Sequence, residues 1–411
     1  MKARAYLVGG AVRDQLLGKE PKDLDYVIVG STIEEMEANG FTKVGKDFPV
    51  FLHPESKDEY ALARKETKNG VGYHGFKCEF GVDVTLEEDL YRRDLTINSI
   101  ARDLTTGELF DPYNGLKDIE DKVLRHTNPD AFTDDPLRAL RLARFAAQLG
   151  DEWSIHPETM KLIPAAAKEL YAVSSERLWG ELFKTLNSKS PWRFFEVLKG
   201  TGAFPMFDIM EDTPQRADYH PEGNVWIHTG LVVDYASKHY NDPLVTFGAL
   251  VHDLGKPVTY KKTGGKLHGH DKDGVPITEA LCDMLKCPSE YRAFGVIATK
   301  LHQKLHDGLK MSPSGMMRLF KDSGALRGES GYKRFMQLLN VGVADSRGRG
   351  KPFDTSETPE LEHLKKCLDA VCKIDNASVM EAAKDRNLKG AAIGELLHKE
   401  RLKAIKQVEK I

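Results

Sequence analysis

The sequence predicts an α+β protein in which a unit with a small mixed β-sheet is followed by all-helical units. Between residues 6 and 66, short apolar runs alternate with turn residues, in the order YLVGG, DYVIVG, PVFL and EYALAR. From about Pro136 the apolar spacing becomes helical, as in LRALRLARFAAQL and SERLWGELFKTL. The chain has 411 residues, 41% of them hydrophobic, which is too many for one ordinary core. We therefore expect two to four packed units.

Turn-rich segments indicate where the helical part divides. Pro, Asp and Gly are frequent from Met206 to Gly223 and again from Lys351 to Pro359, so we predict two linkers. The resulting division is 1–130, 131–215, 216–350 and 351–411. The last part is a charged helical tail that ends in LLHKERLKAIKQVEK. Its basic side chains are either a solvated face or a weak RNA contact, and we favour the solvated face.

Charge and cysteine usage limit the possible classes of protein. The formal net charge is −3, whereas a protein that holds nucleic acid by bulk charge is strongly basic, so any RNA contact must be local. The apolar run around Leu7 is too short for a signal sequence or a membrane span. We expect a cytoplasmic protein with no membrane contact and no obligatory protein partner. The cysteines are odd in number, which favours free thiols in a reducing compartment over zinc or disulfides; they are Cys78, Cys282, Cys287, Cys367 and Cys372.

Two aspartates, Asp23 and Asp25, lead into the β-branched run Tyr26, Val27, Ile28 and Val29, which is predicted to be a strand. Residues two apart on a strand project from the same face, so the two carboxylates should lie together. Such a pair repels unless a cation intervenes, and hard oxygen ligands suit Mg²⁺. The pair would then activate a 3′-hydroxyl and steady a leaving pyrophosphate. The alternative is two solvated acids at a polar strand entry.

Just upstream, residues 6–18 read YLVGGAVRDQLLG, an apolar strand that gives way to two glycines and then to a helix starting near Ala11. Glycine lets the backbone approach a phosphate closely, and Arg13 adds a bidentate donor in the first helical turn. This arrangement suits a triphosphate. The alternative is a tight strand-to-helix turn with a surface arginine.

Residues 90–101 read LYRRDLTINSIA, and their polar set is Arg92, Arg93, Asp94 and Asn98. This set is either a surface ion-pair network or a contact to phosphate and ribose. For the second possibility we expect Arg93 to touch the nucleotide and Asp94 to hold Arg93 in place.

Asp135, Arg138, Arg141 and Arg144 recur every three residues on a predicted helix, so neighbours in the series share a face. Asp135 can accept from an exocyclic amino group while Arg138 donates to the adjacent ring nitrogen. Cytosine and adenine present that edge, whereas uracil and guanine present the reverse, so the pair would admit CTP and ATP. The alternative is that Asp135 only caps the helix, with Pro136 at the first helical position.

Jointly, these motifs resemble the class II tRNA nucleotidyltransferases, the CCA-adding enzymes, with bacterial poly(A) polymerase as a near relative. The resemblance rests on six segments in order: GGAVRD at 9–14, DLD at 23–25, RRDLTIN at 92–98, DPYNGLKD at 111–118, DDPLRALR at 134–141 and SERLWGEL at 175–182. It implies a nucleotidyltransferase head at 1–130, a helical base-reading neck at 131–215, and tRNA, CTP and ATP as substrates. The chain departs from the family in having Asp134 and Pro136 where a glutamate and a non-proline residue are usual.

The resemblance also assigns roles to residues. It implies that Asp23 and Asp25 bind Mg²⁺ and that Asp135 with Arg138 forms the template for the incoming base. Further nucleotide contacts are implied for Gly10, Arg13 and Arg93, on the triphosphate, and for Arg141 and Arg144.

Residues 225–236 (VWIHTGLVVDYA) and 247–257 (FGALVHDLGKP) resemble an HD domain, which would span 216–350. Imidazole and carboxylate groups with open positions suit a first-row transition metal of the Ni²⁺, Mn²⁺ or Co²⁺ type, here on His228, His252, Asp253 and Asp345. His270 and His302 could complete a second metal site. The resemblance implies an accessory phosphohydrolase of the 2′,3′-cyclic phosphodiesterase or phosphatase type. Three other readings remain open: a poly(A) polymerase, chiefly an HD phosphohydrolase, or a catalytically silent RNA-binding protein.

Overall fold

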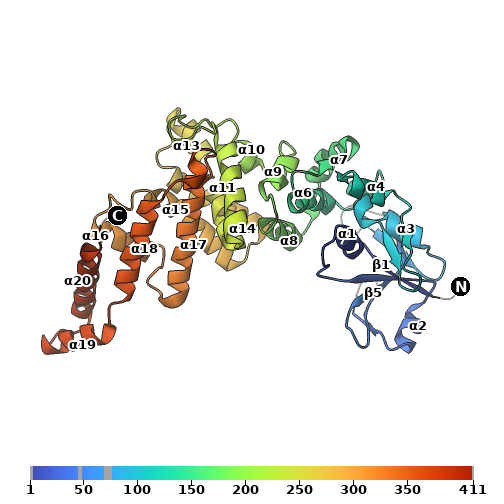
Figure 1. The fold of residues 1–411 in the computed structure, drawn as a ribbon, viewed down its shortest axis with the longest axis horizontal. Helices are drawn as coiled ribbons and strands as arrows, with labels where there is room; N and C mark the ends of the chain where they lie inside the picture. Colours follow the sequence, from blue (N-terminus) through green and yellow to red (C-terminus); the bar gives the residue numbers. More distant parts are fainter. Residues whose placement is uncertain (1–2, 45–48, 69–75, 410–411) are drawn as a thin grey trace. The chain divides into compact units, whose positions relative to one another are not determined.

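The computed structural model describes residues 3–44, 49–68 and 76–409. The chain forms two compact units, drawn in blue to green and in yellow-green to red (Figure 1). Unit 1 comprises Met1–Leu182 and Arg193–Phe204, and unit 2 comprises Phe183–Trp192 and Pro205–Ile411. The finer division into four parts stays a prediction.

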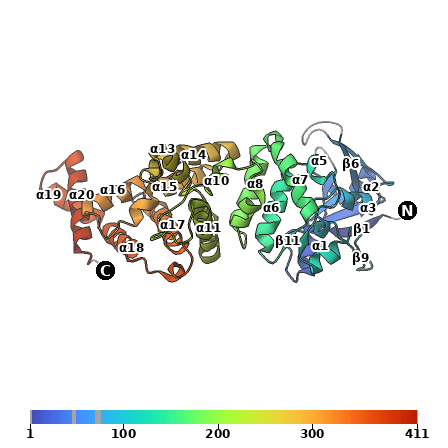
Figure 2. The ribbon, with the colours of Figure 1, turned by 90° about the horizontal axis from the view of Figure 1, so that it is seen from above.

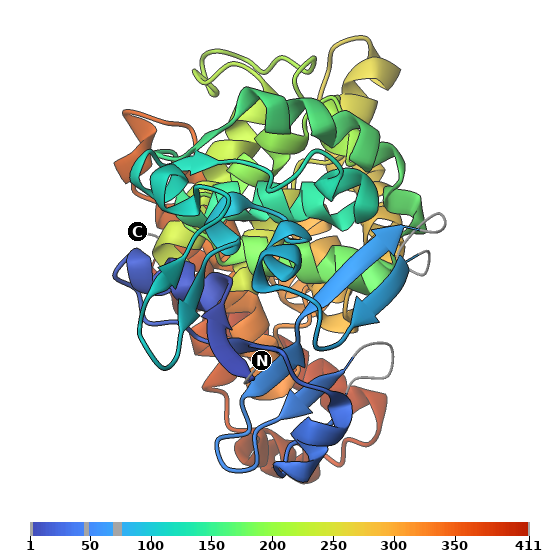
Figure 3. The ribbon, with the colours of Figure 1, turned by 90° about the vertical axis from the view of Figure 1, so that its right-hand side faces the viewer.

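Unit 1 is built on a seven-stranded sheet with the order β3-β4-β5-β2-β1-β8-β9. The β2–β5 pair is parallel and the other neighbours are antiparallel, so the sheet is mixed, as predicted. Its strands are β1 (Arg4–Val8), β2 (Asp25–Val29), β3 (Thr42–Lys43), β4 (Val50–Leu52), β5 (Glu59–Leu62), β8 (Ala101–Asp103) and β9 (Leu109–Phe110). Two further pairs are β6 (Arg64–Lys68) with β7 (Phe76–Phe80), seen as a pair of blue arrows in Figure 3, and β10 (Val123–Leu124) with β11 (Ser154–Ile155).

Helices cover both faces of this sheet because side chains alternate along each strand. On one face, Leu7 packs with the helix that follows β1, and Ile28 packs with Met36 of the next helix. On the other face, Val8 and Val27 pack with Leu90. Asp25 is two residues from Val27 and therefore shares this second face. The helices concerned are α1 (Gly10–Leu16), α2 (Ile33–Ala38) and, on the second face, α3 (Leu86–Tyr91).

The rest of unit 1 is mostly helical. Two of its helices begin with a capping box, since Thr32 and Thr85 each form reciprocal hydrogen bonds with the glutamate three residues on. The elements are η2 (Thr96–Asn98), α4 (Gly115–Glu120), α5 (Ala131–Asp134), α6 (Leu137–Leu149), α7 (Pro157–Lys168) and η3 (Leu170–Ala172), while α8 (Ser175–Leu186) and α9 (Trp192–Leu198) contribute residues to both units.

Unit 2 is helical throughout its described residues. Its central helix, α12, is buried from Leu244 to Val251 and packs against α11, α15 and α17, while α13, α14 and α15 lie side by side (Figure 2). Its elements are α10 (Pro205–Asp208), α11 (Val225–Tyr240), α12 (Pro243–Val251), α13 (Lys256–Thr263), α14 (His270–Leu285), α15 (Ser289–Leu305), α16 (Pro313–Asp322), α17 (Gly328–Arg347), η4 (Phe353–Thr355), α18 (Pro359–Cys372), α19 (Asn376–Asp385) and α20 (Ala391–Gln407).

The structure bears on two expectations, those about membrane spans and about the cysteines. Within 3–44, 49–68 and 76–409, no helix combines the length and the apolar character needed to cross a membrane. Cys282, Cys287, Cys367 and Cys372 are free thiols, and the side chain of Cys78 lies outside what the structure describes.

Candidate active sites

The turn between β1 and α1 brings the backbone against an arginine. Gly9 has φ +69°, and a Cβ built on it would lie 2.7 Å from Nη1 of Arg93. Only glycine combines that backbone conformation with that approach. The helix begins at Gly10, one residue before the predicted start, so Arg13 is its fourth residue and lies in the last turn of this short helix, not in the first turn as predicted. The glycine pair therefore lets the Arg93 side chain pack directly on the loop.

The two predicted metal ligands lie at the start of β2. Asp25 is the first residue of the strand, whereas Asp23 precedes the strand in a bend. The alternation argument therefore holds for Asp25 and does not extend to Asp23, a correction to the prediction that both sit on one strand. Both side chains are exposed and open to a cation and its waters. Burial lowers the pKa of Arg93, while the carboxylates of Asp89 and Asp25 oppose that shift.

Arg93 is held by Asp89, not by Asp94 as predicted. The fully buried Asp89 carboxylate lies 3.0 Å from Nη2 of Arg92 and 3.1 Å from Nη2 of Arg93. Burial alone would raise the pKa of Asp89, but the two guanidinium groups outweigh it and lower that pKa. One end of α3 thus fixes both arginines.

Asp94 instead belongs to a chain of polar contacts that joins the glycine turn to α6. Arg13 Nη1 donates to Asn98 Oδ1 at 2.7 Å, and Asn98 Nδ2 donates to Asp94 Oδ1 at 2.9 Å. Arg141 Nε then donates to Asp94 Oδ2 at 2.7 Å. Cation–π contacts hold the same two arginines, since Cζ of Arg13 and Cζ of Arg141 lie 5.0 and 5.7 Å from the centre of the Phe145 ring. Three predicted nucleotide contacts, Arg13, Arg93 and Arg141, are thus positioned by other side chains.

Asp135 and Arg138 each have protein partners at the start of α6. Asp135 Oδ1 accepts from the backbone N of Leu137 at 3.1 Å, and its Oδ2 accepts from Arg177 Nη2 at 2.7 Å. Arg138 donates to the carbonyls of Ala131 (3.0 Å) and Arg92 (2.5 Å). The capping geometry that the sequence offered as an alternative is therefore present. It leaves the base-reading role of this pair a prediction.

Arg144 is buried among protein partners. It is 6% exposed, its Nε lies 2.5 Å from Glu181 Oε2, and its guanidinium stacks 4.1 Å from the Phe145 ring. These contacts hold the Arg144 side chain between α6 and α8. The buried contacts give Arg144 a packing role, and its nucleotide contact stays a prediction.

In unit 2 the four predicted ligands converge from three places in the chain: His228 on α11, His252 and Asp253 directly after α12, and Asp345 on α17. His228 Nε2 lies 3.0 Å from Asp345 Oδ1 and 3.6 Å from Asp253 Oδ2. His252 Nε2 lies 3.1 Å from Asp253 Oδ2 and 3.9 Å from Asp345 Oδ1. All four residues are buried. The sequence prediction that they form one group is therefore matched by the geometry.

A second group shares Asp253. Its other oxygen, Oδ1, lies 3.3 Å from Nε2 of His270 and 3.4 Å from Nε2 of His302. Burial lowers the pKa of His302 to about 4, so this imidazole is neutral and can offer a lone pair. The two oxygens of one carboxylate thus face two sets of histidines.

The donors fit a metal. His252 Nε2 is buried, and it has no aligned hydrogen-bond partner in the described part of the chain. Buried polar atoms are normally satisfied, so a nitrogen of this kind, aimed at two carboxylates, suits a cation. Burial alone would raise the pKa of Asp253, but His252 and Lys256 outweigh it and hold that pKa well below its usual range. The carboxylate is therefore ionised and ready to ligate.

Sequence reasoning missed the residues around these ligands. Glu222 Oε1 lies 2.7 Å from Nδ1 of His228 and 2.9 Å from Nδ1 of His220. Burial would raise the pKa of Glu222, but the two histidines outweigh it and lower it to about 2. Lys256 Nζ lies 2.5 Å from Asp253 Oδ2. The segment Met206–Gly223 is thus more than the linker we predicted, and its only sequence signal was a His and a Glu two residues apart shortly before His228.

Comparison with known proteins agrees with this division of chemistry. Three family models match: the poly A polymerase head domain at 5–125, the probable RNA and SrmB-binding site of polymerase A at 153–209, and the HD domain at 225–318. The chain is 43% identical to the multifunctional CCA protein of Paraburkholderia phymatum, over 97% of this chain and 96% of that protein. It is 45% identical to the protein of the same name from Shewanella frigidimarina, over 92% of each chain. The chain belongs to the multifunctional CCA protein family.

Members of this family are CCA-adding nucleotidyltransferases, and this chain is one by descent. Solved structures agree in fold. A CCA-adding enzyme in its apo form II has a TM-score of 0.64 at 20% identity, covering 100% of this chain and 89% of that one. A tRNA-processing enzyme has a TM-score of 0.60 at 21% identity, covering 98% and 97%. The predicted α+β head followed by helical parts and an HD domain is confirmed.

Proposed function

We propose that this chain adds and repairs the 3′-terminal CCA of tRNA, using CTP and ATP and no nucleic-acid template. The observation that carries the proposal is the glycine turn packed against Arg93, which interacts electrostatically with Asp25. Related enzymes of the same fold have been solved in complex with ATP and with CTP. The names and the near full-length match of the curated relatives support tRNA as the acceptor.

Asp23 and Asp25 would hold Mg²⁺, which would activate the 3′-hydroxyl and offset the charge of the leaving pyrophosphate. The other parts of the chain bind and orient. Gly9 and Gly10 let the backbone approach the triphosphate, and Arg13 and Arg93 donate to its oxygens. Asp89 and Asn98 hold these two guanidinium groups in place, so their orientation is set before the nucleotide arrives.

The incoming base would be read by Asp135 and Arg138. In this role Arg138 would give up its hydrogen bonds to the carbonyls of Ala131 and Arg92 and donate to the base instead. Asp135 would keep its hydrogen bond to the backbone N of Leu137 and accept from the base with its remaining lone pairs. The same edge on cytosine and adenine explains how one protein template admits two bases.

Nucleotide incorporation tests this proposal. We expect tRNAs lacking one, two or three 3′ nucleotides to accept A, then C and A, then all of CCA, and to accept no U or G. Extension with ATP alone on every acceptor would instead identify a poly(A) polymerase. A failure to incorporate any nucleotide, with tRNA bound, would support the silent RNA-binding alternative and end the proposal.

We further infer a second activity in unit 2, the hydrolysis of phosphate esters of the 2′,3′-cyclic phosphodiester or phosphomonoester type. The unsatisfied His252 Nε2 among His228, Asp253 and Asp345 carries this inference. A transition metal of the Ni²⁺, Mn²⁺ or Co²⁺ type would supply a hydroxide nucleophile there. Glu222 Oε1 lies 2.7 Å from Nδ1 of His228 and would orient that ring so that its Nε2 faces Asp345 and Asp253.

The test is hydrolysis of a 2′,3′-cyclic nucleotide after dialysis against a chelator and reconstitution with each metal. We expect activity with at least one transition metal and none with Mg²⁺ alone. A metal-free enzyme that retains full hydrolysis would overturn the assignment.

A further inference from the structure

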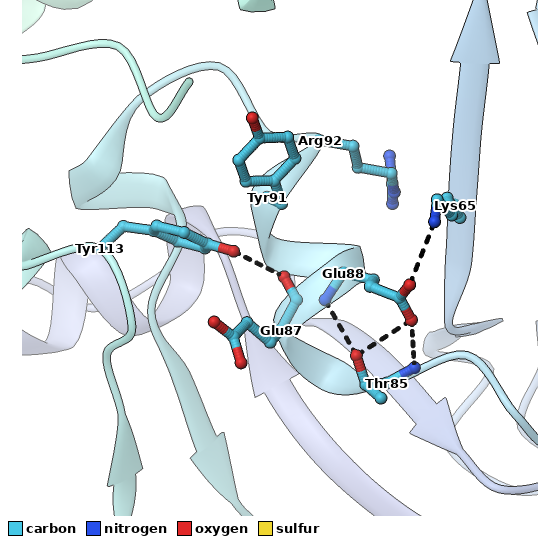
Figure 4. Close-up of a pocket in the computed structure, with 7 residues that line it drawn as sticks. All are labelled: Lys65, Thr85, Glu87, Glu88, Tyr91, Arg92 and Tyr113. Carbon is cyan, nitrogen blue, oxygen red and sulfur yellow. Dashed lines mark hydrogen bonds and ion pairs between the residues drawn. The ribbon is translucent and has the colours of Figure 1, made fainter. Parts of the chain in front are cut away.

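A pocket with two tyrosines and two cations opens beside α3, on the face of the sheet that carries Asp25. Its volume is about 340 Å³, within the range of small-ligand sites. Figure 4 shows Tyr91 and Tyr113 toward one side and Lys65 and Arg92 toward the other. The residues that line it are Lys65, Thr85, Glu87, Glu88, Tyr91, Arg92 and Tyr113.

The pocket adjoins the groups that the proposed reaction uses. Arg92 shares the buried Asp89 carboxylate with Arg93, which interacts electrostatically with Asp25. The backbone carbonyl of Arg92 accepts from Nη2 of Arg138, the proposed base reader. Arg92 therefore connects the pocket to Arg93, a proposed triphosphate contact, and to the base-reading helix α6. None of the roles proposed above uses Tyr91, Tyr113 or Lys65.

Hydrogen bonds hold the backbone at Tyr91 and the ring of Tyr113. Asn128 Nδ2 donates to the carbonyl of Tyr91 at 2.6 Å, and Tyr113 Oη donates to the carbonyl of Glu87 at 3.1 Å. The two rings lie 5.8 Å apart at 56°, and the Tyr91 side of the pair is open, since Tyr91 is 47% exposed. An aromatic surface held in this way can stack on a flat ligand at little entropic cost.

The donors and acceptors around the pocket suit a nucleotide. Lys65 pairs with Glu88 at 3.3 Å and Arg92 with the buried Asp89 at 3.0 Å, and each cation has further N–H donors that a phosphate can share; the Glu88 carboxylate is also held by Thr85. The exposed carboxylate of Glu87 can accept from an exocyclic amino group of a base. Aromatic rings combined with Lys and Arg are the usual means by which proteins hold unpaired nucleotides.

We propose that this pocket binds an unpaired nucleotide of the RNA acceptor, 5′ of the nucleotide whose 3′-hydroxyl reacts. The proposal rests on the proposed CCA addition, because it places the acceptor strand beside the site of transfer. Stacking on Tyr91, with the phosphate near Lys65 and Arg92, would hold the growing end in line while the incoming base lies against α6.

The test replaces Tyr91 with Ala and compares it with Phe110→Ala, a control aromatic side chain that is 39% exposed on β9 of the same unit and lies outside the RNA-binding match at 153–209. For Tyr91→Ala we expect the KM for tRNA and the Kd for tRNA measured without nucleotide to rise about tenfold, the size of one lost base–aromatic stack. The KM for CTP should change less than twofold. Tyr91→Phe should behave like wild type, since it keeps the ring.

Three outcomes would overturn the proposal: unchanged tRNA affinity in Tyr91→Ala, an equal loss in Phe110→Ala, or a rise in the KM for CTP with tRNA binding intact. The last would show that the pocket takes a free nucleotide. The Kd measurement also separates this proposal from the proposed function, because it reads tRNA binding even in an enzyme that incorporates nothing. Melting temperatures of the variants show whether a loss reflects unfolding.

Discussion

Replacement of Asp135 tests whether that residue reads the base or only caps a helix. The structure gives its carboxylate one cap hydrogen bond, to Leu137, and one partly exposed ion pair, to Arg177. Losing the cap costs about 1 kcal/mol, and the ion pair adds about 0.2–1 kcal/mol. Asp135→Ala should thus lose about 1–2 kcal/mol of stability, a fall in Tm of about 2–8 °C for a domain of this size class. A lost bidentate base contact would in addition lower the ratio of kcat/KM for CTP over UTP about 5- to 150-fold.

The chain offers a matched control. Asp242 precedes Pro243 and caps α12 through the backbone N of Leu244 at 2.9 Å, with a second side-chain partner in Gln337. It therefore repeats the Asp-Pro-Leu arrangement of Asp135 in the other unit. Asp242→Ala should cost similar stability and leave the CTP-over-UTP ratio unchanged.

The assay is kcat/KM for CTP, ATP and UTP on one tRNA acceptor, together with Tm. Asp135→Asn separates the two roles further, because asparagine caps as well as aspartate but brings a donor to the position of an acceptor. An Asp135→Ala enzyme that is destabilised like Asp242→Ala and keeps its preference for CTP would refute the template role.

Three further sets of variants probe the remaining assignments. Asp23→Asn or Asp25→Asn should abolish incorporation while tRNA binding, measured by filter retention, stays near wild type; substantial incorporation by either variant would contradict the metal assignment. His252→Ala combined with Asp253→Ala should remove metal-dependent hydrolysis and spare CCA addition, whereas loss of both activities in a folded protein would mean that unit 2 serves the transfer reaction. Glu222→Gln should weaken transition-metal binding about 10- to 100-fold by equilibrium dialysis, with Glu222→Asp intermediate, and an unchanged affinity would show that Glu222 does not orient His228.

The sequence predicted those parts of the molecule in which periodicity or a local turn decides the structure. Alternating apolar residues specify both faces of β2, and the glycine pair marks the turn after β1, so the head was predictable. Asp23 shows the limit of this reasoning, because it lies two residues before the strand begins, where side chains need not alternate between the two faces.

Side-chain partners from distant segments were harder to predict. His220 and Glu222 lie between helices, and nothing in the local pattern shows that they approach His228. Asp89 could have been found, since it precedes Arg92 and Arg93 by three and four residues, the spacing of neighbours on a helix. Arg144 followed the same three-residue series as Arg138 and Arg141, but a helix turns such a series gradually away from its first face, and the last member is buried against Glu181.

The space beside Gly9 has a consequence for how this loop tolerates mutation. Nη1 of Arg93 occupies the position that a side chain at residue 9 would need, so the two residues share one volume. Any larger residue at position 9 must both adopt an unfavourable positive φ and displace the guanidinium, and the buried Asp89 would then keep only one of its two arginine partners, Arg92. A shorter side chain at position 93 would relieve the clash. It would neither relieve the backbone strain at position 9 nor replace the lost partner of Asp89. We therefore expect a substitution at either position to lower stability, and a substitution at the other position not to restore it. Gly9 and Arg93 should then change in evolution only together with the residues around them.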